Sequence, residues 1–256
     1  MGRHNPFTEG SSHYATARPQ YPARLFDYLC GLCPNLGNAW DCATGTGQAA
    51  VSLAERFSSV EATDVSLEQI GSAQKHERVR YSVQQAEETV FTDNSFSLVT
   101  VAQALHWFDL RRFWPEVHRV LAPDGIFAAW AYTWPHITGD IDRIIQDKLL
   151  NAIEGFWAPN NRLAWHGYEE IEFPFHEIDA PEIALSLDWD LNQFLSYLRT
   201  WSATRRCVSD RGQGFFQEFT EAIHEAWGNA ECTKRVTMEF YCRVGRHDHQ
   251  ALRPHQ

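Results

Sequence analysis

The sequence predicts an α/β protein with a mostly parallel sheet and helices on both faces. Two observations support this fold class. Short apolar runs alternate along the chain with segments whose apolar residues recur at helical spacing. The first such run, 39–41, passes through Gly45 and Gly47 into a helix that begins near Gln48. A strand, a tight glycine turn and a helix in this order form a ligand pocket at the carboxyl end of the first strand of α/β sheets.

The other expected elements follow one another along the chain. A helix over 23–32 precedes the glycine turn, and its apolar residues share one face. Further strands are expected at 59–64, 79–84, 97–102 and 126–130, with a helix from about 110 to 121. Because strands and helices alternate, we expect right-handed crossovers between parallel strands. After about residue 132 the pattern loosens, and we expect helices at 141–153, 190–201 and 215–227 and a late strand at 236–244.

Composition limits the classes of partner. The chain has 256 residues and a formal net charge of -11, which disfavours nucleic acid as a partner because phosphate binding needs a basic face. We expect no membrane partner either, since no apolar run approaches the length that crosses a bilayer. Residues 1–12 are polar and lack a signal region, and the six cysteines are scattered, so we expect a reduced, cytoplasmic protein. Cys30 and Cys33 form a C-x-x-C without a second pair, which predicts buried thiols and no metal.

Two acidic residues stand at strand ends beside the glycine turn. Asp41 places a carboxylate where a cationic ligand group could rest. Asp64 ends the second strand at the position where such folds hold a ribose diol, although it could instead cap the helix that begins near Leu67. The run from Gly45 to Ala50 also satisfies the G-x-G-x-x-A dinucleotide fingerprint, so a nicotinamide cofactor remains an alternative at this point.

Five segments of the sequence belong together: Asp41 to Gly47, Asp64, Ala86-Glu87, Gln103 to Phe108, and Tyr14 to Pro22. Together they resemble class I S-adenosylmethionine-dependent methyltransferases, and in particular the small-molecule branch of trans-aconitate methyltransferases within the methyltransferase type 11 group. Asp41 to Gly47 is similar to the family's D-x-G-x-G-x-G, with Ala43 in place of the first glycine. Asp64 is similar to its ribose acid and Ala86-Glu87 to its adenine-contacting pair. The remaining similarities are the segment after the fourth strand, Gln103-Ala104-Leu105-His106-Trp107-Phe108, and the Y-x-x-x-R-P-x-Y-P arm, Tyr14 to Pro22.

The resemblance implies a Rossmann-like seven-stranded sheet with the late strand inserted antiparallel. It implies S-adenosyl-L-methionine as cofactor, S-adenosyl-L-homocysteine as product, no metal, and methyl transfer to a small-molecule acceptor by a monomer or homodimer. The implied cofactor contacts are Tyr14, Asp41, Ala43, Gly45, Gly47, Asp64, Val65, Ala86, Glu87 and Gln103. An NAD(P)-dependent oxidoreductase is the alternative, but it explains the glycines and Asp64 without explaining the arm or the His106-Trp107 segment.

The expected mechanism relies mainly on positioning, because the sulfonium already activates the methyl group and orientation lowers the remaining barrier. His106 is either a general base or a residue that positions the cofactor, and we favour positioning. Trp107 is expected on the acceptor side. If the acceptor is a carboxylate, it needs no base, and the candidate cations are Arg18, Arg205 and Arg206, although the pair at 205 and 206 also suits a solvated helix end.

The expected domain organisation is a flexible N-terminus over 1–13, one methyltransferase domain over 14–245 and a loose tail over 246–256. Within the domain, a cofactor-binding core covers about 14–132 and a cap insertion about 133–200. The cap is rich in aromatic residues, which either line an apolar pocket or pack internally.

Overall fold

The computed structural model describes residues 18–248. Within this range the chain divides into two compact units. Unit 1 contains 18–19, Thr133–Asn161 and Ala184–Glu239, and unit 2 contains Gln20–Tyr132, Arg162–Ile183 and 240–248. None of the helices in this range is long and apolar enough to span a bilayer.

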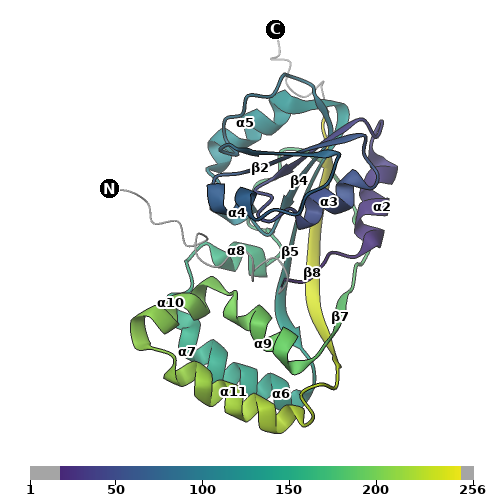
Figure 1. Cartoon of the computed structure of the whole chain (residues 1–256). Coiled ribbons are helices and arrows are strands. Elements are labelled where there is room, and N and C mark those ends of the chain that lie inside the picture. Colours follow the sequence, from purple (N-terminus) through teal and green to yellow (C-terminus); the bar gives the residue numbers. More distant parts are fainter. Residues whose placement is uncertain (1–17, 249–256) are drawn as a thin grey trace. The chain divides into compact units, whose positions relative to one another are not determined.

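Unit 2 is built on a parallel sheet, in which Figure 1 labels β2 (Ser59–Asp64), β4 (Phe96–Ala102) and β5 (Leu121–His136). In the order of the parallel strands, β1 (Asn38–Cys42) is central. β1 pairs in parallel with β2 on one side and with β4 on the other. β3 (Val79–Val83) extends the sheet beyond β2, and β5 extends it beyond β4, again in parallel. The carboxyl ends of these strands therefore share one edge, where the predicted site residues follow them.

Both faces of the sheet are buried, which explains the near-continuous apolar character of its strands. Ala39 packs on one face with α2 (Ala23–Leu32) and α3 (Gln48–Ala54), while its neighbour Trp40 packs on the other face with α5 (Leu110–Val120). Two-residue periodicity along the strands thus separates two cores, one on each side of the sheet.

The late strand is β8 (Lys234–Arg246), which follows β5 in the strand order and pairs antiparallel with β6 (His176–Ile178). The unit 1 half of β8 pairs antiparallel with β7 (Leu185–Trp189). The sheet within 18–248 therefore has eight strands, with order β3-β2-β1-β4-β5-β8-β6 and β7 beside β8. The predicted mostly parallel α/β fold is confirmed, and the one strand beyond the expected seven is the short β7.

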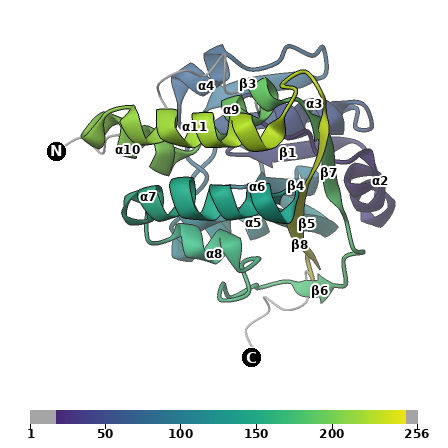
Figure 2. The ribbon, with the colours of Figure 1, turned by 90° about the horizontal axis from the view of Figure 1, so that it is seen from below.

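The helices of unit 1 form a bundle, in which α11 (Gly214–Trp227) lies alongside the helical segment after β5 (Figure 2). That segment consists of α6 (Gly139–Ile144), the π-helical turn η2 (Ile145–Leu150), α7 (Asn151–Ile153) and η3 (Glu154–Phe156). α9 (Leu191–Arg199) begins with a capping box between Asp190 and Gln193. α10 (Ser202–Arg211) was not expected from the sequence, because the residues that it buries are small or polar rather than an apolar stripe.

The short helices of the chain complete the description. α4 (Leu67–Gly71) follows β2, the 3-10 turn η1 (Leu105–Trp107) follows β4, and α8 (Asn161–Trp165) precedes β6.

The segment Arg162–Ile183 belongs to unit 2, although the sequence places it within the cap. Its phenylalanines pack on the core of unit 2: the Phe175 ring stacks on Phe127 of β5 at 5.1 Å and meets Trp114 of α5 edge-on at 5.7 Å. Phe173 adds an edge contact with Trp114 at 6.2 Å. This aromatic packing attaches the segment to the sheet and not to the helices around it in the sequence.

Candidate active site

The glycine turn after β1 is held in a backbone conformation that side chains disfavour. Ala43, Gly45 and Gly47 all have positive φ, at 54°, 56° and 85°. The turn is fastened by a hydrogen bond from the Thr44 N–H to the Thr63 carbonyl at 2.9 Å and one from the Gly47 N–H to the Thr44 carbonyl at 3.0 Å. Glycine adopts this left-handed conformation without the strain that a side chain brings, which explains the residues at 45 and 47.

The two glycines of the turn serve different purposes. A Cβ on Gly47 would overlap the hydroxyl oxygen of Tyr81 and lie 3.0 Å from its Cζ, so Gly47 is required by packing. A Cβ on Gly45 would meet only the Gln69 side-chain oxygen, at 3.9 Å. Among residues 18–248, nothing else lies within 4 Å of that position, so the Gly45 backbone is uncovered on this side.

Asp41 is fully buried at the end of β1, and its carboxylate has internal partners. It accepts hydrogen bonds from the Thr44 hydroxyl at 2.5 Å, from the Thr100 hydroxyl at 2.8 Å and from the Ala50 backbone. Burial nevertheless raises the pKa of Asp41 to about 6, against the lowering effect of these hydrogen bonds. The geometry shows Asp41 holding the turn and the start of α3 together.

Asp64 links β2 to the turn. One carboxylate oxygen accepts a hydrogen bond from the Gly45 N–H at 2.9 Å, and the other accepts one from the Ser66 N–H at 2.9 Å. Burial raises the pKa of Asp64 above its ordinary value, with these backbone donors opposing the rise. The N-cap of α4 is Ser66, whose hydroxyl accepts from the Gln69 N–H, so capping falls to Ser66. A carboxylate has about four lone-pair sites, so Asp64 keeps capacity for a further donor.

Three predicted cofactor acids gather around the end of β1. The pKa of the buried Cys42 thiol is raised first by burial and then by the charges of Asp41, Asp64 and Glu87. Each of these charges acts on Cys42, the last residue of β1, so each of the three carboxylates lies near the end of β1. Their combined field favours a cationic ligand.

Apolar side chains lie open to solvent beside Asp64. Val65 is 58% exposed and Leu67 74% exposed, and Val83, which pairs in register with Asp64, is 48% exposed. Val65 follows β2, Leu67 begins α4 and Val83 ends β3, and exposed apolar side chains at these places suit a planar ligand group. Of the three, the sequence predicts Val65 only.

Ala86 and Glu87 follow β3. Ala86 is buried, and Glu87 accepts a hydrogen bond from the Asp109 N–H at 2.9 Å. Asp109 is the N-cap of α5. Glu87 thus connects the segment after β3 with the start of α5, which follows the His106-Trp107 turn.

Gln103 fastens the end of β4 to the neighbouring strand β5. It adopts a φ of 58°, its N–H donates to the Trp130 carbonyl at 2.9 Å, and its side-chain amide donates to the Tyr132 carbonyl at 3.2 Å. Both partners lie within β5, and these bonds set the direction in which the chain leaves β4.

His106 lies in η1, buried between aromatic rings. Its ring centroid is 4.8 Å from that of Trp107, and its Nδ1 is 3.4 Å from the Tyr168 hydroxyl. Burial lowers the pKa of His106 to about 4, so the imidazole is neutral at pH 7. A group with that pKa is a weak general base at neutral pH.

The remaining predicted residues lie in unit 1 or outside the described range. The Arg18 guanidinium lies over the Tyr197 ring at 5.6 Å, and Arg205 lies in the first turn and a half of α10. The rings of Trp134, Trp157 and Trp201 pack against one another with centroids 5.4 to 5.8 Å apart. Tyr14, like the first residues of the proline-tyrosine arm, lies outside residues 18–248.

Comparison with known proteins decides the family. Residues 40–129 match the model of a methyltransferase domain. A solved structure from Anaeromyxobacter dehalogenans, assigned as a type II methyltransferase, is 38% identical, covers 90% of this chain and 98% of its own, and superimposes with a TM-score of 0.83. The chain belongs to the S-adenosylmethionine-dependent methyltransferases.

Two curated relatives agree with this membership. A methyltransferase of Dictyostelium discoideum is 29% identical over 221 residues, which are 85% of this chain and 84% of the relative. A Saccharomyces cerevisiae protein named as an S-adenosylmethionine-dependent methyltransferase is 28% identical over 134 residues, or 49% of this chain and 46% of its own. The match thus spans about half of the yeast protein. Membership favours the methyltransferase interpretation of the glycine turn over the nicotinamide alternative.

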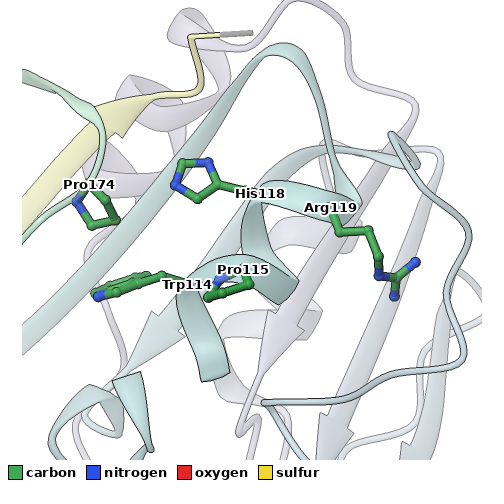
Figure 3. Close-up of a pocket in the computed structure, with 5 residues that line it drawn as sticks. All are labelled: Trp114, Pro115, His118, Arg119 and Pro174. Atoms are coloured by element: carbon green, nitrogen blue, oxygen red, sulfur yellow. The ribbon is translucent and has the colours of Figure 1, made fainter. Parts of the chain in front are cut away.

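The methyltransferase also has an apolar pocket of about 430 Å³ on the outer side of α5. Figure 3 shows Trp114 and His118 pointing from α5 toward Pro174, and Arg119 pointing to the other side of the helix. The pocket contains none of the predicted site residues. Arg119 forms ion pairs with Asp93 at 2.8 Å and Glu116 at 2.6 Å, so its charge is balanced within the protein.

Proposed function

We propose that this methyltransferase binds S-adenosylmethionine in unit 2, at the carboxyl ends of β1 and β2, and transfers its methyl group to a small-molecule acceptor. The observation that carries the proposal is the convergence of Asp41, Asp64 and Glu87 on the end of β1, next to the uncovered backbone of Gly45. Within the family we propose the small-molecule branch, on the His106-Trp107 segment and the proline-tyrosine arm.

Charge supports this cofactor over a dinucleotide. S-adenosylmethionine carries a positive sulfonium and a positive ammonium group and no phosphate, whereas a nicotinamide dinucleotide carries an anionic pyrophosphate. Carboxylates near the end of β1 attract the first and repel the second. The residues present therefore fit the cofactor that the family uses.

We assign each predicted residue a part in holding that cofactor. Asp64 takes the ribose hydroxyls with the lone-pair capacity that its backbone donors leave, and Val65 contributes an apolar surface beside it. Ala86 and Glu87 bound the adenine side. The others act on the backbone that meets the cofactor: Asp41, Ala43 and Gly47 shape the turn, and Gln103 directs the chain out of β4.

The chemistry asked of the chain is orientation. When bound, the cofactor supplies a methyl group that its sulfonium has already activated. The chain then has to hold the acceptor atom in line and keep water out, and alignment of this kind contributes roughly 7–11 kcal/mol in favourable cases. His106 is neutral at pH 7 and buried among aromatic rings, which supports a positioning role. Trp107, half-buried beside it, is the proposed acceptor contact.

A carboxylate acceptor is the finer form of the proposal, with Arg18 and Arg205 as its proposed cations. Arg18 lies against the Tyr197 ring, which fixes the guanidinium at an aromatic surface. Arg205 is the second proposed cation, while its neighbour Arg206 donates to the Phe156 carbonyl at 3.1 Å and so is held by the fold. The cap insertion remains a proposal over about 133–200, and unit 1 contains its parts 133–161 and 184–200.

Calorimetric titration tests the cofactor proposal. The full chain is titrated with S-adenosylhomocysteine and with NAD, in the wild type and in Gly45→Ala. We expect binding of the adenosyl compound alone, weakened at least about tenfold in Gly45→Ala, since a Cβ there occupies the uncovered backbone position. Gly228→Ala is the matched control: Gly228 also has positive φ and open space around its Cβ position, but it ends α11 in unit 1. Binding of NAD alone would contradict the proposal.

An acceptor screen tests the small-molecule part. Methyl-labelled S-adenosylmethionine is incubated with the protein and pools of small carboxylic acids, phenols and amines, with total RNA and total protein in parallel. Label in the small-molecule fraction is the expected result, and label only in a macromolecular fraction would overturn it. If a carboxylic acid is the acceptor, Arg18→Ala should raise KM more than it lowers kcat, because a guanidinium fork binds the carboxylate in ground and transition states alike.

A further inference from the structure

Tyr168 occupies an unusual position behind the His106-Trp107 turn. Its backbone φ is 65°, directly after Gly167 at 60°. A bulky residue in the left-handed region is a backbone outlier that persists only where its surroundings fix it. The side chain is almost completely buried. The sequence alone does not predict a role for Tyr168, since it lies in neither the glycine motif nor the segment after β4.

Two residues of β8 hold the segment that carries Tyr168. The Arg243 guanidinium donates to the Tyr168 carbonyl at 2.9 Å and to the Ile171 carbonyl at 2.7 Å. It also pairs with Glu177 at 2.9 Å. A Cβ on Gly167 would lie 2.9 Å from the Tyr241 ring, so β8 presses directly on the turn. The placement of Tyr168 is therefore imposed by long-range contacts.

The Tyr168 hydroxyl lies between the backbone and the imidazole of the η1 turn. The Leu105 N–H donates to the hydroxyl oxygen, and this donor opposes the rise of the Tyr168 pKa that burial causes. The net rise keeps the phenol protonated at any ordinary pH. The buried phenol proton also needs an acceptor, and among the described residues His106 Nδ1, 3.4 Å away, is the acceptor beside it, so the hydroxyl donates to Nδ1. The two rings stack at 6.1 Å with 26° between their planes.

A hydrogen bond received at Nδ1 decides which nitrogen of a neutral imidazole carries the proton. If Nδ1 accepts, the proton is on Nε2, because a neutral imidazole has one donor and one acceptor. In this tautomer Nε2, the ring nitrogen that points away from Tyr168, carries the proton and is the hydrogen-bond donor. The lone pair that a general base needs is then occupied by Tyr168.

We propose that Tyr168 is a positioning residue for methyl transfer, which fixes His106 as the Nε2–H tautomer so that His106 offers the reacting groups a hydrogen-bond donor and not a base. The catalytic part of this proposal rests on the proposed function. The tautomer of His106 does not depend on that function, so the tautomer and the catalytic role can be tested separately.

Nitrogen NMR of the histidine side chains tests the tautomer. The full chain is labelled with ¹⁵N and recorded at pH 7 with and without S-adenosylhomocysteine, and the His106 signals are assigned by their loss in His106→Gln. We expect a protonated Nε2 and an unprotonated Nδ1, and a shift toward a tautomer mixture in Tyr168→Phe. A protonated Nδ1 in the wild type, or an imidazolium, would overturn the proposal. Failure to bind S-adenosylhomocysteine would instead overturn the proposed function and leave the tautomer result standing.

Substitutions at both residues test the catalytic consequence, with the acceptor that the screen identifies. His106→Gln keeps an N–H donor near the position of Nε2, whereas His106→Leu removes it. We expect His106→Gln to keep kcat within about tenfold of the wild type and His106→Leu to lose about a hundredfold or more. Equal loss in both variants would mean that His106 is a base, since neither glutamine nor leucine can replace one.

A double variant separates positioning from a merely structural role. Tyr168→Phe alone should lower kcat about tenfold with little change in the KM for S-adenosylmethionine. In the His106→Gln background the same substitution should have no further effect, because there is no imidazole left to orient. An equal loss in both backgrounds would refute the proposal. Tyr28→Phe is the matched control, since its hydroxyl donates to the Asp179 carbonyl at 2.9 Å on the surface of unit 2.

Discussion

Replacement of Gly47 by alanine tests directly whether the glycine turn depends on close packing against Tyr81. The Cβ that it adds would overlap the Tyr81 hydroxyl and lie 3.0 Å and 3.1 Å from the Cζ and Cε1 of that ring. Tyr81 cannot simply move aside, because its hydroxyl donates to the Gln74 carbonyl at 2.6 Å. The substitution therefore forces either the loop after α4 or the turn itself to shift.

Two terms set the expected cost in the free energy of unfolding. A left-handed conformation costs an alanine about 1–2 kcal/mol, offset by about 0.4–1 kcal/mol because alanine also restricts the unfolded chain. Overpacking against Tyr81 adds about 1–3 kcal/mol. Gly47→Ala should therefore destabilise the protein by about 2–4 kcal/mol. Gly45→Ala shares only the backbone term and should cost about 1 kcal/mol.

Equilibrium urea unfolding of the four variants of a double-mutant cycle measures both terms. Tyr81→Phe removes the overlapping oxygen, so Gly47→Ala should cost about 1–2 kcal/mol less in that background than in the wild type. Gly45→Ala is the control for backbone strain without overlap. Equal costs for Gly45→Ala and Gly47→Ala, or full additivity with Tyr81→Phe, would refute the assignment of the cost to the Tyr81 ring.

Three further outcomes follow from the same structure. The pKa of Asp41 in the folded protein, about 6, lies above its ordinary 3.8, so the free energy of unfolding falls as pH rises through that window. The free energy of unfolding of Asp41→Asn, relative to that of the wild type, should therefore rise by about 3 kcal/mol between pH 4 and 7. The pKa of His106 in the folded protein, about 4, lies below its ordinary 6.5. The contribution of the neutral imidazole to the free energy of unfolding is therefore complete above pH 6.5 and is lost as pH falls toward 4. In His106→Gln, the free energy of unfolding should change less with pH over this range. Arg243→Lys loses the guanidinium fork that holds two carbonyls beside Tyr168 and should lower the free energy of unfolding by about 2–3 kcal/mol.

These three outcomes are checked by urea unfolding across pH. Because Asp41 and His106 titrate in opposite senses over the same range, the test is the difference between each variant and the wild type, not the shape of the wild-type curve. A difference that does not change with pH would contradict the assigned pKa shifts. Arg235→Lys is the control for Arg243→Lys, since Arg235 pairs with Asp188 on an exposed surface and should leave the unfolding midpoint unchanged.

The residues of the glycine turn were predictable because their chemistry is local. A strand that ends in Asp41, followed by two glycines and a helix, specifies its own conformation within about ten residues, and Asp64 follows one helix later. The structure adds what each side chain does there: Gly47 clears Tyr81, Asp64 fastens Gly45, and these partners come from separate strands.

The aromatic segment around Phe173 was harder to place from the sequence. An aromatic run with few helical or strand signals has no periodicity that shows which element it packs on. Because it follows the helices of 133–161 in the sequence, it was predicted to share a cap with them. Its packing on Trp114 and Phe127 depends on surfaces that exist only after α5 and β5 have assembled.

The sequence by itself determined the alternation of strands and helices, the glycine turn and the acids at the strand ends, since each depends on residues close together in the chain. Only the tertiary structure decided that Tyr168 lies against His106, 62 residues away, and that Arg243 holds it there from another 75 residues on. Those contacts join segments with no shared local pattern. Their geometry arises from the order of strands in the sheet, which brings β8 beside β5 and the segment before β6 against α5.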